Sequence, residues 1–130
     1  MTGKREQNMA LILIVDDSPT EVFQMTKALE QAGFRVEAAA DGEEAIRKAR
    51  EMHPDLILMD IVMPGMDGFR ATRTLANDPE TRSIPVIMVT SKANESDRVW
   101  GMRQGAVDFL VKPVTPAQLR EKAQAALLAS

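Results

Sequence analysis

Short apolar runs alternate with longer amphipathic stretches along almost the whole chain. Residues 11–15 are continuously apolar and stop at an aspartate, which is typical of a strand buried on both faces of a sheet. Similar runs recur at intervals that leave room for a helix between them. The pattern predicts strands at residues 11–15, 34–39, 55–60, 85–90 and 107–111.

An amphipathic stretch follows each strand and predicts a helix. The first helix has Ser18 in the N-cap position, Pro19 at the first helical position and Glu21 three residues after the cap. Gly33 and Gly105 stand where two of these helices should end. The predicted helices cover residues 19–32, 42–52, 69–77, 95–104 and 116–128.

The same periodicity assigns side chains to the core. We expect Met52 to face inward from the second helix, and Val99 and Met102 to face inward from the fourth. Trp100 is the only tryptophan, and we expect it to be partly exposed, either at the rim of the core or in contact with a partner. Asp67 precedes a glycine and should form a turn or a helix cap.

Strands that alternate with helices predict a parallel sheet with helices on both faces, because crossover connections are right-handed. Five such units match an α/β, flavodoxin-like (βα)5 fold, doubly wound, with a five-stranded parallel sheet in the order 2-1-3-4-5.

Composition is that of one globular domain. The chain has 130 residues, of which 45% are hydrophobic and 27% are charged. The net charge of -3 predicts no binding of nucleic acid, and no apolar run approaches the roughly 20 residues of a membrane helix. The absence of cysteine excludes disulfides and thiolate metal sites. We expect a cytoplasmic monomer with no membrane partner, a disordered extension at residues 1–8 and a folded domain at residues 9–130.

Chemically active side chains stand at the carboxyl ends of the predicted strands, where open α/β sheets carry their sites. Asp16 and Asp17 follow the first strand, and Asp60 ends the third. Thr90 ends the fourth strand, and Lys112 follows the fifth. Three carboxylates, a hydroxyl and an ammonium should therefore meet at one edge of the sheet.

Clustered carboxylates repel one another, and a hard divalent cation such as Mg²⁺ relieves that repulsion. A carboxylate can also act as a nucleophile and form an aspartyl-phosphate. Asp60 is suited to that role because it ends a central strand between the acidic pair and Thr90. Lys112 would supply positive charge to the transferred group.

The sequence resembles the response-regulator receiver family across residues 9–126. The individual motifs are weak alone, but all of them occur in the family's order and spacing. They are residues 14–18, 58–68, 84–90, 105–106 and 112–113.

The resemblance implies a role for each matching residue. Asp60 would accept the phosphoryl group. Asp17 would bind Mg²⁺ directly, Asp16 largely through water, and the backbone carbonyl of Val62 would be a further ligand. These assignments make Mg²⁺ the one expected cofactor.

Further residues are implied to form the switch. Thr90 would move toward the phosphoryl group, and Phe109 would rotate into the vacated space. Lys112 would pair with the phosphoryl group, and its bond to Pro113 would be cis. Val62 and Lys92 cannot orient a water as a carboxylate or amide does, which predicts at most a weak, slow autophosphatase activity and no other enzymatic activity.

A narrower likeness, carried by residues 17–21 and 97–106, is to the single-domain regulators of type IV pilus twitching motility. It implies a histidine kinase of the chemotaxis type as phosphoryl donor. The downstream partner would be a motility or signalling protein that binds the face of the fourth helix, fifth strand and fifth helix. We expect no DNA-binding or enzymatic output domain after Ser130, and therefore output by protein binding.

Other interpretations remain beside this one. The domain could serve only as a phosphate sink, or as a degenerate receiver that binds partners without phosphorylation. A phosphatase of the haloacid-dehalogenase kind is disfavoured because its paired aspartates stand two residues apart on one strand. A flavin-binding flavodoxin is disfavoured because Asp16 and Asp17 would repel a phosphate.

Overall fold

The computed structural model describes residues 10–91 and 94–129. The predicted extension at residues 1–8, and Lys92, lie outside these described residues. Strands and helices alternate as expected, with boundaries within one or two residues of the prediction. The elements are β1 (Leu11–Val15), α2 (Pro19–Gln31), β2 (Arg35–Ala39), α3 (Gly42–Met52), β3 (Leu56–Met59), α4 (Gly68–Asn77), β4 (Val86–Thr90), α5 (Glu95–Gln104), β5 (Asp108–Val111) and α6 (Pro116–Ala129).

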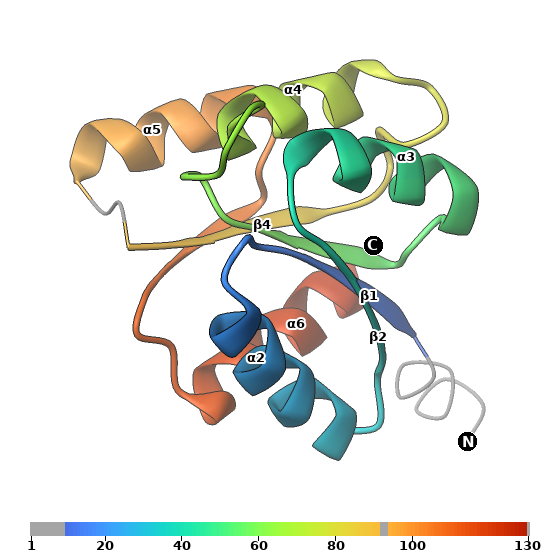
Figure 1. Cartoon of the computed structure of the whole chain (residues 1–130), viewed down its shortest axis with the longest axis vertical. Helices are drawn as coiled ribbons and strands as arrows, with labels where there is room; N and C mark the ends of the chain where they lie inside the picture. The colour runs from blue at the N-terminus through green and yellow to red at the C-terminus, as the bar shows by residue number, and fades with distance from the viewer. Residues whose placement is uncertain (1–9, 92–93, 130) are drawn as a thin grey trace.

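The five strands form one sheet in the order β2-β1-β3-β4-β5, and every pair is parallel. The predicted flavodoxin-like order is therefore confirmed. Figure 1 shows α3, α4 and α5 on one face of the sheet and α2 and α6 on the other. Val15 pairs with Met59, so β1 and β3 end at the same level, and Met59 pairs with Met88, so β4 continues two residues further to Thr90.

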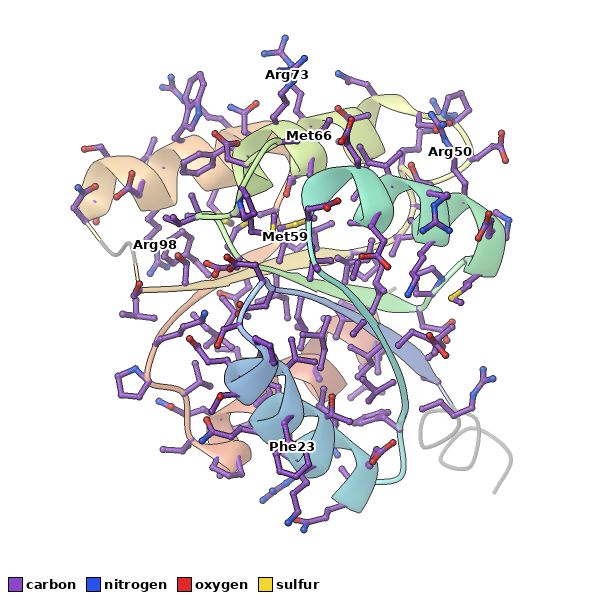
Figure 2. All side chains as sticks on the ribbon, in the orientation of Figure 1. Phe23, Arg50, Met59, Met66, Arg73 and Arg98 are labelled. Carbon is purple, nitrogen blue, oxygen red and sulfur yellow. The ribbon has the colours of Figure 1, made fainter. Side chains whose placement is uncertain are left out.

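Alternate residues of β3 point into two separate cores. Ile57 and Met59 belong to the core beneath α3, α4 and α5, whereas Leu56 and Leu58 belong to the core shared with α2 and α6. Figure 2 shows Met59 between the sheet and the layer that contains α4. Burial of both faces explains the continuous apolar run, because each fully buried side chain contributes about 1.5–3 kcal/mol.

The predicted inward-facing side chains are wrong on two helices, α5 and α3. Val99 and Met102 are exposed, and the buried residues of α5 are instead Asp97, Gly101 and Gln104. The reason is close packing at Gly101, where an added Cβ would lie 3.5 Å from Met88 and 3.6 Å from Phe69. The helix packs on the core through Gly101, and the periodicity of apolar residues does not reveal a buried glycine.

The second wrong prediction concerns the end of α3. Met52 is exposed because it is the last residue of α3, one turn beyond the last buried residue, Ala49. Trp100 is exposed, as expected for a residue at the rim of the core or in contact with a partner.

Side-chain caps fix where the helices begin. Ser18 caps α2 and accepts a hydrogen bond from the backbone N–H of Glu21, and Asp67 caps α4 in the same way through Arg70. Both caps were predicted. Among the described residues, no helix has the length and apolar character needed to span a membrane.

Candidate functional site

Adjacent parallel strands bring two carboxylates to the same edge of the sheet. Asp16 follows β1, and its N–H donates to the carbonyl of Ala39 at 3.0 Å. Asp60 follows β3, and its N–H donates to the carbonyl of Val15 at 2.9 Å. The sheet's own hydrogen bonds therefore continue through the first residue after each strand and fix both aspartates.

Asp16, Asp17 and Asp60 form a cluster in which one carboxylate oxygen from each lies within 4.8 Å of the others. Asp16 and Asp60 are buried and Asp17 is exposed. Oxygens bound to one octahedral Mg²⁺ at about 2.0–2.1 Å are about 2.9 Å apart when adjacent and about 4.2 Å apart when opposite, so the three carboxylates would draw closer together to hold the ion. The hard oxygen donors and the water-accessible Asp17 fit Mg²⁺, which keeps several of its waters.

Lys112 joins the fifth strand to this cluster. Its Nζ lies 2.7 Å from Asp16 Oδ2 and 3.3 Å from Asp60 Oδ2. Its backbone N–H donates to the carbonyl of Thr90 at 3.0 Å, which fixes the start of the side chain. The Lys112–Pro113 peptide bond is cis, as the resemblance implied.

Burial alone would lower the pKa of Lys112, but hydrogen bonds to Asp16 and Glu21 and the charge of Asp60 outweigh it. The pKa therefore lies above the ordinary lysine value, and the side chain is an ammonium at every physiological pH. A permanent cation beside Asp60 suits a site that receives a phosphoryl group.

Sequence reasoning missed the part that Glu21 plays in the site. Its Oε1 lies 2.7 Å from Lys112 Nζ, as close as the carboxylate of Asp16. In the sequence Glu21 was assigned only to the first turn of a helix. The available signal was that α2 begins two residues after Asp17, which places its first turn over the acidic cluster.

The remaining predicted residues lie around this centre. Thr90 is buried at the end of β4, two residues beyond Met88, which pairs with the last residue of β3. Phe109 is buried against the core beneath α5 and is thus already inside in this structure. The side chain of Val62 is exposed, as expected for a residue that would offer only its carbonyl.

The backbone of Asp60 is held by the loop that follows it. Ile61 N–H donates to Asp60 Oδ1 at 2.7 Å, and Gly68 N–H donates to the carbonyl of Ile61 at 2.9 Å. An added Cβ on Gly68 would lie 2.0 Å from the carbonyl oxygen of Asp60. The first turn of α4 therefore rests directly on the main chain of this aspartate.

Comparison with known proteins agrees with this geometry. Residues 12–124 match the response regulator receiver domain family. The chain is 54% identical over 119 residues to Protein PilH of Pseudomonas aeruginosa, a match that covers 92% of this chain and 98% of PilH. Several further relatives are longer, and the chain spans 24% of one and 50% of another.

Solved structures show the same fold. Chemotaxis protein CheY4 of Vibrio cholerae superposes with a TM-score of 0.87 at 35% identity, over 92% of this chain and 99% of CheY4. The receiver domain of a Pseudomonas aeruginosa sensor histidine kinase superposes with a TM-score of 0.85 at 34% identity, over 92% and 98% of the two chains. That structure has a magnesium ion coordinated in its active-site cleft.

The expected resemblance is therefore confirmed at the level of fold, family and relative. The acidic cluster at the ends of β1 and β3, with a lysine after β5, lies within the matched residues. The chain belongs to the response-regulator receiver domain family of two-component phosphorelay signalling.

Proposed function

We propose that Asp60 accepts a phosphoryl group from a histidine kinase in a reaction that requires Mg²⁺. The observation that carries the proposal is the position of Lys112 Nζ, which contacts Asp60 at 3.3 Å and Asp16 at 2.7 Å beside the three-carboxylate cluster. A buried carboxylate with a fixed cation on one side and a metal-binding set on the other is equipped for phosphoryl transfer.

The two oxygens of Asp60 have different surroundings. Oδ1 accepts the N–H of Ile61, whereas Oδ2 faces Lys112 and is the candidate nucleophile. Oδ2 forms the new bond to phosphorus as the P–N bond of the phosphohistidine donor breaks, and the imidazole leaves. Lys112 then faces the added negative charge, and the Thr90 hydroxyl donates a hydrogen bond to a phosphoryl oxygen.

Asp16, Asp17, Asp60 and the carbonyl of Val62 would hold Mg²⁺. When bound, the ion neutralises charge on the carboxylates and on the transferred group. The donor oxygens of the three aspartates support this assignment, as does the magnesium-bound receiver domain described above.

The output surface in this proposal is the face of α5, β5 and α6. Exposed apolar side chains on its elements and their connections include Met102, Val107 and Val111. The phosphoryl group would shift the population between two arrangements of this face, and only its differential contacts can drive that shift.

The likeness to PilH supports a motility regulator that is phosphorylated by a chemotaxis-type kinase in the cytoplasm. The partner of the phosphorylated form would be a motility or signalling protein. A phosphate sink would have the same site and no partner for that form. Slow autodephosphorylation is expected in either case, because Val62 offers no side-chain group to orient water.

The test is phosphorylation by acetyl phosphate, read as intact mass. We expect a gain of one phosphoryl group that requires Mg²⁺, and none in Asp60→Asn. The asparagine keeps the shape of the side chain and removes the nucleophilic charge. A gain of equal size in Asp60→Asn would contradict the assignment of the acceptor.

A further inference from the structure

Lys112 is held by a carboxylate that belongs to neither the metal cluster nor the phosphoacceptor. Glu21 Oε1 lies 2.7 Å from Lys112 Nζ, closer than Asp60 Oδ2 at 3.3 Å. Glu21 stands in the first turn of α2, where its N–H bonds to the Ser18 cap. The side chain therefore reaches the ammonium from a fixed helix end.

An ammonium has three N–H donors, and Lys112 has three carboxylate partners in this structure. Transfer to Asp60 Oδ2 passes the donor that faces this oxygen to the phosphoryl group, and Lys112 can turn a second donor to the phosphoryl oxygens only if Asp16 or Glu21 is released. The partner most exposed to solvent is the easiest to release, because a carboxylate that returns to water regains its hydration. The Glu21 side chain is 41% exposed, compared with 1% for Asp16 and 9% for Asp60.

We propose that Glu21 is a positioning residue that competes with the phosphoryl group for Lys112 and thereby slows phosphorylation of Asp60. The proposal rests on the proposed function. A phosphoryl group adds about 1.5 to 2 negative charges, so the Glu21 carboxylate also repels the phosphoryl group with which it competes for Lys112. Glu21 is released to solvent when Lys112 turns to the phosphoryl oxygens.

The competition predicts faster phosphorylation when Glu21 loses its charge. We expect Glu21→Gln to take up phosphate from acetyl phosphate with Mg²⁺ about two- to fivefold faster than the wild type, the range typical of a partly exposed ion pair. Initial rates are read by intact mass. Glu30→Gln is the matched control, because it makes the same charge change on an exposed residue of the same helix and should leave the rate unchanged.

A second measurement reads the contact without phosphorylation. In the metal-free protein, the 15Nζ resonance of Lys112 should shift in Glu21→Gln and remain in place in Glu30→Gln. The resonance detects the contact with Lys112 itself. A general effect on stability would instead be detected by thermal unfolding of each variant.

The outcomes distinguish this proposal from the one on which it rests. If the wild type gains phosphate and Glu21→Gln is no faster, the competition is wrong and the proposed function stands. A slower Glu21→Gln also overturns the proposal, because it would mean that Glu21 holds Lys112 in place for the reaction. If no variant and no wild-type protein gains phosphate, both proposals fail.

Discussion

Gly68 is the residue at which the main chain of the site leaves no room for a side chain. The contact is with backbone rather than with a movable side chain, since an added Cβ would meet the carbonyl oxygen of Asp60 at 2.0 Å. Relief would require movement of α4 or of the segment that carries Asp60. A glycine eight residues after the acceptor thus contributes to the position of the acceptor.

Gly68→Ala should therefore lower both stability and phosphorylation. We expect a loss of about 1–3 kcal/mol in the free energy of unfolding, as for other overpacked sites, measured by urea denaturation. The phosphorylation rate should fall as well. Gly65→Ala is the control, because Gly65 has a φ of +73° but open space around its Cβ position. It should lose stability through strain alone, and equal loss of phosphorylation in both variants would argue against the contact with Asp60.

Residues of the candidate site differ in how far the sequence predicts them. Asp16, Asp60 and Lys112 are predictable because the carboxyl ends of parallel strands must meet at one edge. Glu21 is not, because its sequence position is equally typical of a helix start. Its part in the site depends on where the first turn of α2 lies in space, and that is set by packing on the sheet.

At the scale of elements, an ion pair ties β5 to α6. Lys122 Nζ lies 2.8 Å from Asp108 Oδ2. Burial alone would raise the pKa of Asp108, but the hydrogen bonds from Lys122 and from the Phe109 N–H outweigh it and hold the pKa below 3.8. A carboxyl whose pKa is depressed on folding stabilises the protein above its unfolded pKa, and that contribution is lost as pH falls through the folded pKa.

Lys122→Met should reduce the free energy of unfolding at neutral pH by up to about 1 kcal/mol, since the pair is partly exposed. The difference from the wild type should narrow as the pH falls from 3.8 through the lower pKa of Asp108 in the folded protein, because the carboxylate is then protonated. Urea denaturation at several pH values measures it. The double variant with Asp108→Asn completes a thermodynamic cycle, and a difference that persists unchanged at low pH would show that lost packing, not charge, is responsible.

Elements themselves are largely predictable, because their apolar runs and caps are local signals. The five predicted strands and five predicted helices follow from the pattern, whereas the strand order, which is also confirmed, was taken from the likeness to flavodoxin-like folds. The buried face of α5 does not, because the helix packs through Gly101 and Gln104 rather than through Val99 and Met102. The periodicity of the sequence shows which residues are apolar, whereas the close approach of a helix to the core depends on small side chains at the contact.

At the scale of the whole molecule, α5 connects the site to the proposed output surface. A Cβ on Gly101 would lie 3.7 Å from Phe109, so α5 and the predicted switch residue of β5 are in contact. Trp100 is the neighbour of Gly101 and is exposed. A change at Phe109 is therefore expected to alter the surroundings of Trp100.

Because Trp100 is the only tryptophan and lines a groove between α4 and α5, its fluorescence reports on the surroundings of α5. Addition of beryllium fluoride, a phosphoryl mimic, together with Mg²⁺ should change the emission of the wild type. Asp60→Asn should show no such change. An identical response in both proteins would mean that the signal does not come from the acceptor site.

Asp16 and Lys112, which are in contact, are separated by 96 positions in the chain. During synthesis the nucleophile emerges from the ribosome about fifty residues before the ammonium that completes the site, and β5 can join the sheet only after β4 has formed. Under the proposed function, a nascent chain or a fragment lacking β5 would display the aspartate without the ammonium that assists its reaction. Competence to receive a signal would then depend on complete folding, and unfinished or damaged copies would draw no phosphate from the kinase.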